Sequence, residues 1–150
     1  MADRVQFELV SPERLLLSEM VEMVVIPGAE GNFGVLPGHA PLISTIRPGM
    51  IEIYEGRTVV RRLFVVGGIA EVTPERCTVL ADAAMPPEHL DRGAIEAELQ
   101  IVEGNLPSLR ERVGRAAGTE RERLVAELHA LEHDQRVAQA KLQALVEASR

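Results

Sequence analysis

Apolar and polar residues alternate with a period of two along the first part of the chain. Val5, Phe7 and Leu9 fall on one face of an extended segment, whereas Gln6 and Glu8 fall on the other. Similar short segments are closed by Gly or Pro, as expected for strands that end in turns. These further strand candidates are residues 23–26, 51–54, 59–66, 69–73 and 77–80. Short strands without an intervening helical pattern predict a compact antiparallel sandwich or barrel.

One segment, residues 27–42, differs from the rest because it contains four Gly and three Pro. We expect it to form an irregular, exposed surface rather than a strand. It lacks the Lys and the following helix of a phosphate-binding loop. One interpretation is a rigid loop that displays Glu30, Asn32 and His39 to a partner, and the other is simply two tight turns.

After residue 87 the spacing of apolar residues becomes that of a helix. Asp91 is a suitable N-cap, and Ile95 starts a stripe with spacings of four and three that ends near Pro107. Thr119 and Glu122 form a capping box that would open a second helix. The stripe of this second helix consists of Leu124, Leu128, Leu131, Gln135, Ala138, Leu142 and Leu145. Two facing stripes predict an antiparallel helical hairpin.

Composition divides the chain at the same place. Residues 1–87 hold eight of the nine Pro and all four aromatic residues, whereas residues 88–150 hold ten Ala and no aromatic residue. We therefore assign a β domain to residues 1–87 and the helical hairpin to residues 88–150. Because Gln135 and Ala138 bury little apolar area in the seam, we expect the hairpin to lean on the β domain or on a partner, and to change position.

Charge and composition exclude several classes of protein. The net charge of −7 argues against nucleic-acid binding. Cys77 is the one cysteine, so a disulfide within the chain is excluded. No run approaches the roughly 20 apolar residues of a membrane-spanning helix, and the first residues resemble neither a signal peptide nor a transit peptide. We expect an ordinary soluble domain from a reducing compartment.

No combination of residues marks a catalytic or metal site. His129 and His133 lie one helical turn apart, but Glu132 is the nearest candidate for a third ligand, so we expect a solvated surface there. Cys77 falls within a predicted strand, where a small buried residue is usual. The serines lack a nucleophile elbow. We therefore expect a chain that is not itself an enzyme and that holds no cofactor or metal ion.

Arginine supplies 15 of the 16 basic side chains, and five of them gather between the two helical stripes, interleaved with Glu. These five are Arg110, Arg112, Arg115, Arg121 and Arg123. One interpretation is a solvated turn that is rich in ion pairs. The alternative is an arginine-rich contact for an acidic partner surface, made through bidentate hydrogen bonds.

Residues 37–42 read PGHAPL and residues 47–51 read RPGMI, and both resemble the signature of the epsilon subunits of F-type ATP synthases. Three flanking segments resemble the family in the same order and spacing, namely residues 7–13, 66–72 and 78–84. The resemblance covers residues 5–85, and the helical half is similar in size and pattern. It implies an N-terminal β-sandwich of about ten strands, followed by a pair of C-terminal helices.

The resemblance also implies a function. Such a subunit belongs to the rotor's central stalk, where its sandwich binds the gamma subunit and the ring of c subunits and transmits torque. Its hairpin would reach the alpha and beta subunits and restrain ATP hydrolysis, while the subunit itself catalyses nothing. The implied location is peripheral, on the cytoplasmic side of the bacterial plasma (inner) membrane.

Particular residues are assigned by the same resemblance. The c-ring contacts would be Glu30, Gly31, Asn32, His39, Ala40 and Pro41, with His39 also contacting gamma. Some members bind ATP through an Arg at the position that Ala94 occupies here, close to Asp91 and Arg92. The side chain of alanine cannot donate a hydrogen bond to a phosphate, so we expect no ATP at this place.

Two roles of the hairpin remain open. As a latch, it would extend and contact acidic loops of the catalytic head through the five arginines, whereas as a strut it would stay folded and stiffen the stalk. Outside the family, the alternatives are a free-standing β-sandwich adaptor with a coiled-coil arm and a nucleotide-sensing module.

Overall fold

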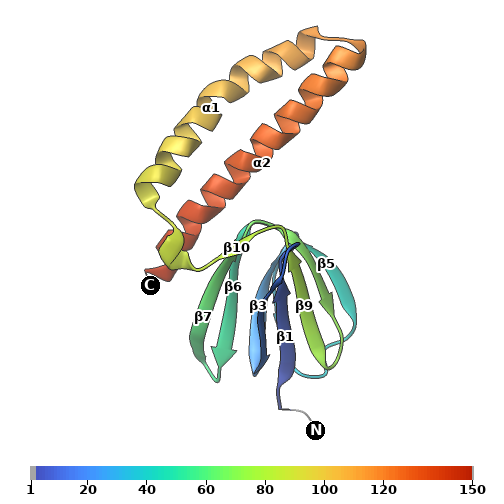
Figure 1. The fold of residues 1–150 in the computed structure, drawn as a ribbon, viewed down its shortest axis with the longest axis vertical. Helices are drawn as coiled ribbons and strands as arrows, with labels where there is room; N and C mark the ends of the chain where they lie inside the picture. Colours follow the sequence, from blue (N-terminus) through green and yellow to red (C-terminus); the bar gives the residue numbers. More distant parts are fainter. Residues whose placement is uncertain (1–2, 150) are drawn as a thin grey trace. The chain divides into compact units, whose positions relative to one another are not determined.

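A computed structural model describes residues 3–149, which form two units: the first ends at His89 and the second begins at Leu90 (Figure 1). The strands of the first unit are β1 (Val5–Val10), β2 (Leu15–Val21), β3 (Met23–Gly28), β4 (Gly31–Val35), β5 (Leu42–Ile46), β6 (Gly49–Glu55), β7 (Thr58–Val65), β8 (Gly68–Val72), β9 (Arg76–Ala81) and β10 (Ala84–Met85). The helices are η1 (Pro87–His89), α1 (Arg92–Arg115) and α2 (Gly118–Ala148).

The first unit is a β-sandwich whose core is made by alternate residues, as the sequence predicts. Val5, Phe7 and Leu9 of β1 are buried against Cys77 and Val79 of β9. The strands follow the order β10-β7-β6-β3-β5-β8-β9-β1-β2, with β4 paired to β3. The fold class predicted from the sequence, a sandwich of about ten strands followed by a helical hairpin, is confirmed.

One strand pair departs from the antiparallel arrangement that we predicted. β1 runs parallel to β9, while its other edge is antiparallel to β2. Alternation within a strand reports which face is buried and carries no information on the direction of its neighbours. Because β1 and β9 lie far apart in the sequence, the chain has room for a parallel pairing that a tight hairpin would forbid.

The prediction of an irregular surface over residues 27–42 is wrong for most of that segment. β3 continues through Pro27 to Gly28, and β4 begins at Gly31, so a two-residue turn joins the two strands. A Cβ on Gly28 would lie 2.7 Å from the Gly31 carbonyl oxygen, and Gly31 has a φ of +141°. The two glycines therefore build a tight hairpin. Only the two turn residues, 29–30, and residues 36–41 of the segment remain outside strands, and β2 and β5 were not predicted.

In the second unit, α1 begins as predicted but extends further. Asp91 is its N-cap, and the Asp91 Oδ1 accepts a hydrogen bond from the Gly93 N–H at 3.1 Å. The predicted end near Pro107 is wrong, because the helix continues to Arg115. Pro107 is exposed, so the Glu103 carbonyl that lacks its usual donor lies on the solvent side. Leu106 and Leu109 are buried on the opposite side and hold the helix in place.

The start of α2 also differs from the prediction. The helix begins at Gly118 with Ala117 as its N-cap, and no side chain caps it, so the capping box at Thr119 and Glu122 does not form. Gly118 has a φ of +64°, which lets a connection of only two residues, Ala116 and Ala117, reverse the chain. The five arginines consequently lie within the two helices rather than in a long turn.

The predicted seam of the hairpin is confirmed. Leu124 and Ala138 are buried, and the other five members of the α2 stripe are half-buried. Near the connection, Leu124 packs with Leu109 and Val113 of α1. Polar contacts join the helices further along, including an ion pair of 3.4 Å between Arg110 and Glu132. Neither described helix is long and apolar enough to cross a membrane.

Candidate docking surfaces

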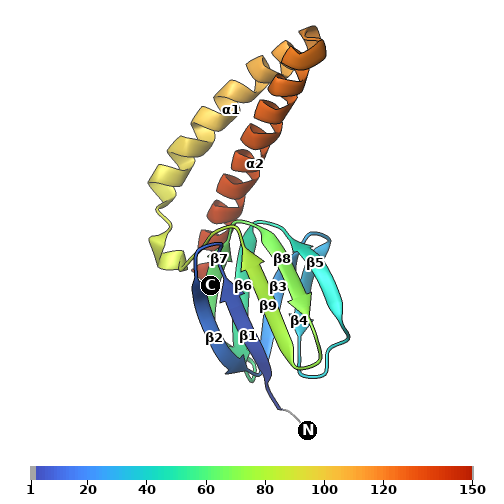
Figure 2. The ribbon, with the colours of Figure 1, turned by 45° about the vertical axis from the view of Figure 1, so that its right-hand side comes forward.

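Strands β2, β1, β9, β8 and β5 are neighbours in one sheet (Figure 2). The outward side of these strands carries a row of apolar side chains, which we call the outer face. Its members are Leu15, Val10, Leu80, Ile69 and Ile43. Val10 is opposite both Leu15 and Leu80, and Leu80 is opposite Ile69. Ile43 follows on the diagonal and is 73% exposed. Apolar side chains that are contiguous across five strands are typical of a protein-binding surface.

The turn between β3 and β4 presents polar groups at one end of β4. Gly28 is opposite Gly31, which leaves Ala29 and Glu30 as the turn residues. Glu30 is exposed, whereas the Asn32 Oδ1 accepts a hydrogen bond of 2.6 Å from the Arg47 guanidinium. Glu30 is therefore the charged side chain that this turn offers to solvent.

The structure does not bring the two predicted groups of c-ring residues together. Glu30, Gly31 and Asn32 lie at the start of β4, whereas His39, Ala40 and Pro41 follow its end. The five residues of β4 separate its ends by about 13 Å. The second group is anchored elsewhere, because the Gly38 N–H donates to the Pro74 carbonyl, 2.8 Å away, in the turn between β8 and β9. His39 is half-buried, and its Nδ1 lies 2.7 Å from the Ala40 carbonyl oxygen.

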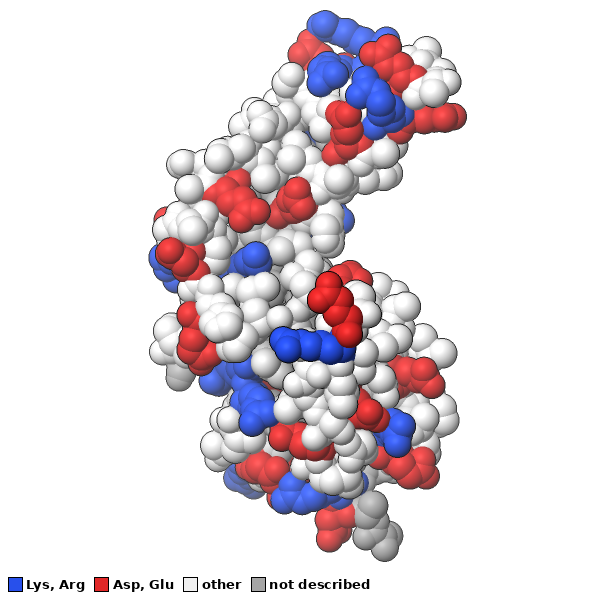
Figure 3. All heavy atoms as spheres, viewed as in Figure 1, with Lys and Arg blue, Asp and Glu red and all other residues white. Residues whose placement is uncertain are grey.

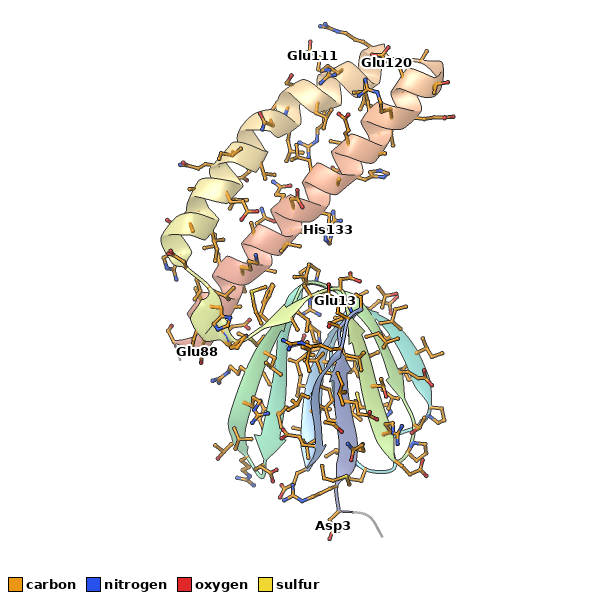
Figure 4. The ribbon with its side chains drawn as sticks, in the orientation of Figure 1. Asp3, Glu13, Glu88, Glu111, Glu120 and His133 are labelled. Atoms are coloured by element: carbon orange, nitrogen blue, oxygen red, sulfur yellow. The ribbon has the colours of Figure 1, made fainter. Side chains whose placement is uncertain are left out.

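The tip of the hairpin carries charges of both signs (Figure 3). Glu111 and Glu120 lie at this tip, while His133 lies further along α2 (Figure 4). Arg115 pairs with Glu111, and Arg123 pairs with Glu127 at 2.8 Å. None of the ion pairs within residues 3–149 includes Arg112 or Arg121. These two exposed guanidinium groups are the ones that the tip leaves for a partner.

The residues considered for a nucleotide already have structural partners. Asp91 caps α1, and Arg92 lies 3.7 Å from Glu96 in an ion pair one turn along the helix. Ala94 is exposed on the same first turn and offers no side-chain donor. The arrangement is that of an ordinary helix start.

The titratable groups show no pattern of a reactive centre among residues 3–149. Burial raises the pKa of the Cys77 thiol to about 12, so this group is an unreactive part of the core. A hydrogen bond from Arg4 lowers the pKa of the Glu55 carboxyl. No three His, Cys, Asp or Glu side chains in the described part of the chain could hold a metal ion.

The comparison with protein families decides what kind of scaffold this is. Residues 4–87 match the beta-sandwich domain of the ATP synthase delta/epsilon chain. An ATP synthase epsilon chain of Rhodospirillum rubrum is 58% identical over 106 residues, which cover 71% of this chain and 79% of that one. The chain belongs to the ATP synthase epsilon chain family. The epsilon chain of Paramagnetospirillum magneticum is 56% identical over 97 residues, covering 65% of this chain and 73% of the relative.

Solved structures share the fold of this epsilon-family chain. A chain in the Euglena gracilis mitochondrial ATP synthase (OSCP/F1/c-ring) has a TM-score of 0.73 at 20% identity, covering 99% of this chain and 82% of that one. A chain in the Tetrahymena thermophila mitochondrial ATP synthase (central stalk/c-ring) has a TM-score of 0.60 at 14% identity, covering 94% and 96% respectively. At these identities the likeness concerns the fold.

Two features of this family member were not predicted from its sequence. The first is the outer face. The sequence feature that could have indicated it is an apolar residue at an outward position in each of β5, β8 and β9, namely Ile43, Ile69 and Leu80. The second is the hydrogen bonding of Arg47 to the β3–β4 hairpin, 15 residues from Asn32. No local pattern indicates such a contact, because it depends on how β5 meets the end of β3.

Proposed function

We propose that this chain is a rotor subunit of the central stalk of an F-type ATP synthase, which couples proton translocation to ATP synthesis and has no catalytic activity of its own. The observation that carries the proposal is the 58% identity to the Rhodospirillum rubrum epsilon chain over 106 residues. A rigid β body with separate contact surfaces suits the transmission of torque between larger partners. The central experiment, described at the end of the Discussion, separates the roles of the two units.

The outer face is the proposed surface for the gamma subunit. Ile69 and Leu80 are each about half exposed, which is costly for large apolar side chains unless a partner covers them. The loop with His39 leads directly into β5, where Ile43 belongs to the outer face. We therefore place His39, Ala40 and Pro41 at the edge of the gamma contact.

The β3–β4 turn is the proposed surface for the c ring. Glu30 is exposed at its tip, and Gly31 and Asn32 follow at the start of β4. A short polar turn with one carboxylate can form hydrogen bonds and ion pairs with polar loops while the body behind it stays rigid. Glu30 precedes β4 and His39 follows it, so the c-ring contact and the gamma contact use different ends of this strand.

The hairpin is proposed to act as a latch on the alpha and beta subunits. Arg112 and Arg121 form no ion pair within the described chain, whereas Arg110, Arg115 and Arg123 on the same two helices each pair with a Glu. Guanidinium groups bind carboxylates through two parallel hydrogen bonds, so an acidic surface is the fitting partner. Bound in this way, the hairpin would resist rotation in the direction of ATP hydrolysis.

Reversing the charge of Arg112 and Arg121 tests the latch. In the assembled synthase, the double variant Arg112→Glu, Arg121→Glu is expected to raise ATP hydrolysis about three-fold to ten-fold, because losing two exposed ion pairs of roughly 0.5 kcal/mol each weakens the contact by about 1 kcal/mol in total. The control is Arg136→Glu, an exposed arginine on α2 outside the tip. Hydrolysis is measured with membranes at matched amounts of synthase. Equal rates of hydrolysis in the double variant and the wild type would contradict the latch and would indicate that these arginines only form a solvated surface.

The proposed location follows from the proposed partners. The matching epsilon chains come from bacteria such as Rhodospirillum rubrum, which supports a peripheral position on the cytoplasmic side of a bacterial inner membrane. The partners of Asp91 and Arg92 within α1 disfavour a nucleotide-sensing module, and we propose that no ATP is bound there.

A further inference from the structure

One guanidinium group holds both strands of the β3–β4 hairpin. The Arg47 Nη1 donates a hydrogen bond of 2.5 Å to the Gly28 carbonyl at the end of β3, and the Nη2 donates one of 2.6 Å to the Asn32 Oδ1 in β4. The Arg47 backbone N–H also donates to the Pro27 carbonyl at 3.0 Å. Arg47 itself follows β5, so it ties the hairpin to a different part of the sandwich.

The turn has few other means of staying ordered. Gly28 and Gly31 flank it, and glycine loses more conformational freedom on folding than any other residue. Ala29 and Glu30 are both exposed, so their side chains add no packing. Besides Arg47, a hydrogen bond of 2.9 Å from the Ala29 N–H to the Thr45 carbonyl fixes the turn to β5. An exposed hairpin end with so little packing opens readily unless polar contacts hold it.

We propose that Arg47 is a positioning residue, which fixes the β3–β4 turn so that Glu30 is presented to the c ring in one orientation. The inference rests on the proposed ring contact of this turn. In this proposal Asn32 has a structural role, because its side-chain oxygen accepts the hydrogen bond from Arg47. Glu30 is then the residue of the turn that contacts the c ring. A pre-ordered turn avoids the entropy cost of ordering on contact.

Amide hydrogen exchange in the full chain measures the order of the turn directly. The variant Arg47→Met keeps most of the apolar stem and removes the donors, and we expect it to raise the exchange rates of Ala29 to Asn32 about ten-fold. Arg47→Lys keeps one charged donor group and is expected to restore part of the protection. The control Arg57→Met removes an exposed arginine from the β6–β7 turn and should leave these rates unchanged.

Substitutions at Asn32 test the partner of Arg47. Asn32→Ala is expected to raise exchange in the turn, whereas Asn32→Asp keeps an acceptor and should preserve protection. In the double variant Arg47→Met, Asn32→Ala, the fold-increase in exchange rate should be smaller than the product of the fold-increases in the two single variants. The reason is that both single variants remove the same contact. Unchanged exchange in Arg47→Met would overturn the proposal.

The ratio of protons pumped to ATP hydrolysed in the assembled synthase gives the functional readout. We expect Arg47→Met to lower this ratio about two-fold or more, with partial rescue in Arg47→Lys. Glu30→Lys tests the ring contact by itself. A pumping defect in Glu30→Lys without one in Arg47→Met would overturn the positioning role alone. Normal pumping in both variants would instead overturn the ring contact proposed for this turn.

Discussion

Replacing Gly68 with alanine is expected to destabilise the sandwich by about 4 kcal/mol or more, which is a large share of the stability of a domain this size. A Cβ at this position would lie 2.1 Å from the Leu80 carbonyl oxygen and 3.0 Å from the Ala81 Cα. Both are backbone atoms of β9, so β8 and β9 would have to separate. The φ of Gly68, +141°, adds strain for any other residue.

Gly67→Ala provides the matched control for this steric effect. Gly67 has nearly the same φ, +144°, but the nearest atom to its Cβ would be the Asp82 Oδ2 at 3.3 Å, which belongs to a movable side chain. We expect this variant to cost about 1–3 kcal/mol, the strain alone. The free energy of unfolding is measured in urea through the fluorescence of Tyr54, the one tyrosine, which lies in β6. Similar losses in both variants would contradict the close approach of β8 and β9.

Placing charge on the outer face is expected to prevent assembly. The double variant Ile69→Asp, Leu80→Asp puts two carboxylates on neighbouring strands where we propose that the gamma subunit binds. Buried without partners, they would weaken binding by at least about 3 kcal/mol, or more than a hundred-fold. Because both side chains are about half exposed in the chain itself, we expect its unfolding midpoint to change little.

The measurement is co-purification of tagged chain with the gamma subunit from cells that express the whole synthase. Val60→Asp is the control, because Val60 is 54% exposed on β7, outside the five strands of the outer face. The control should co-purify like the wild type. Retention of gamma by the double variant would show that the outer face is not the docking surface.

The fold was predictable where local pattern and buried face coincide. In β1 and β9 every second side chain is buried, so the alternation in the sequence locates the strands without further knowledge. Asp91 marks the start of α1 because a cap acts within the first turn. What this reasoning could not supply is the pairing of β1 with β9, since strand direction depends on the path of the whole chain.

The wrong predictions have two physical causes, which are tertiary packing that overrides local preference and tight turns that depend on the backbone freedom of glycine. Pro107 is unfavourable within a helix, yet Leu106 and Leu109 keep α1 continuous past it. Gly28 and Gly31 indicated a loop from composition, but their lack of side chains serves a tight hairpin. Thr119 resembles a cap, but the chain reverses earlier because Gly118 adopts a positive φ.

The candidate surfaces were predictable only in part. The sequence motifs point to the turn at Glu30 and to the loop at His39, but no periodicity indicates that β4 holds them apart. Likewise, the cluster of arginines is visible in the sequence. The sequence does not show that Arg115 forms an ion pair while Arg112 forms none among residues 3–149, because this difference depends on where the Glu side chains lie.

The central claim is that the sandwich alone couples proton translocation to ATP synthesis, while the hairpin only restrains ATP hydrolysis. Removing the second unit from the synthase tests this claim most directly. A chain that ends at His89, the boundary between the units, replaces the full chain in the purified complex. We expect the complex to assemble and pump protons with an unchanged ratio to ATP hydrolysis, while hydrolysis itself rises several-fold. Loss of assembly or of proton pumping in this complex would contradict the account.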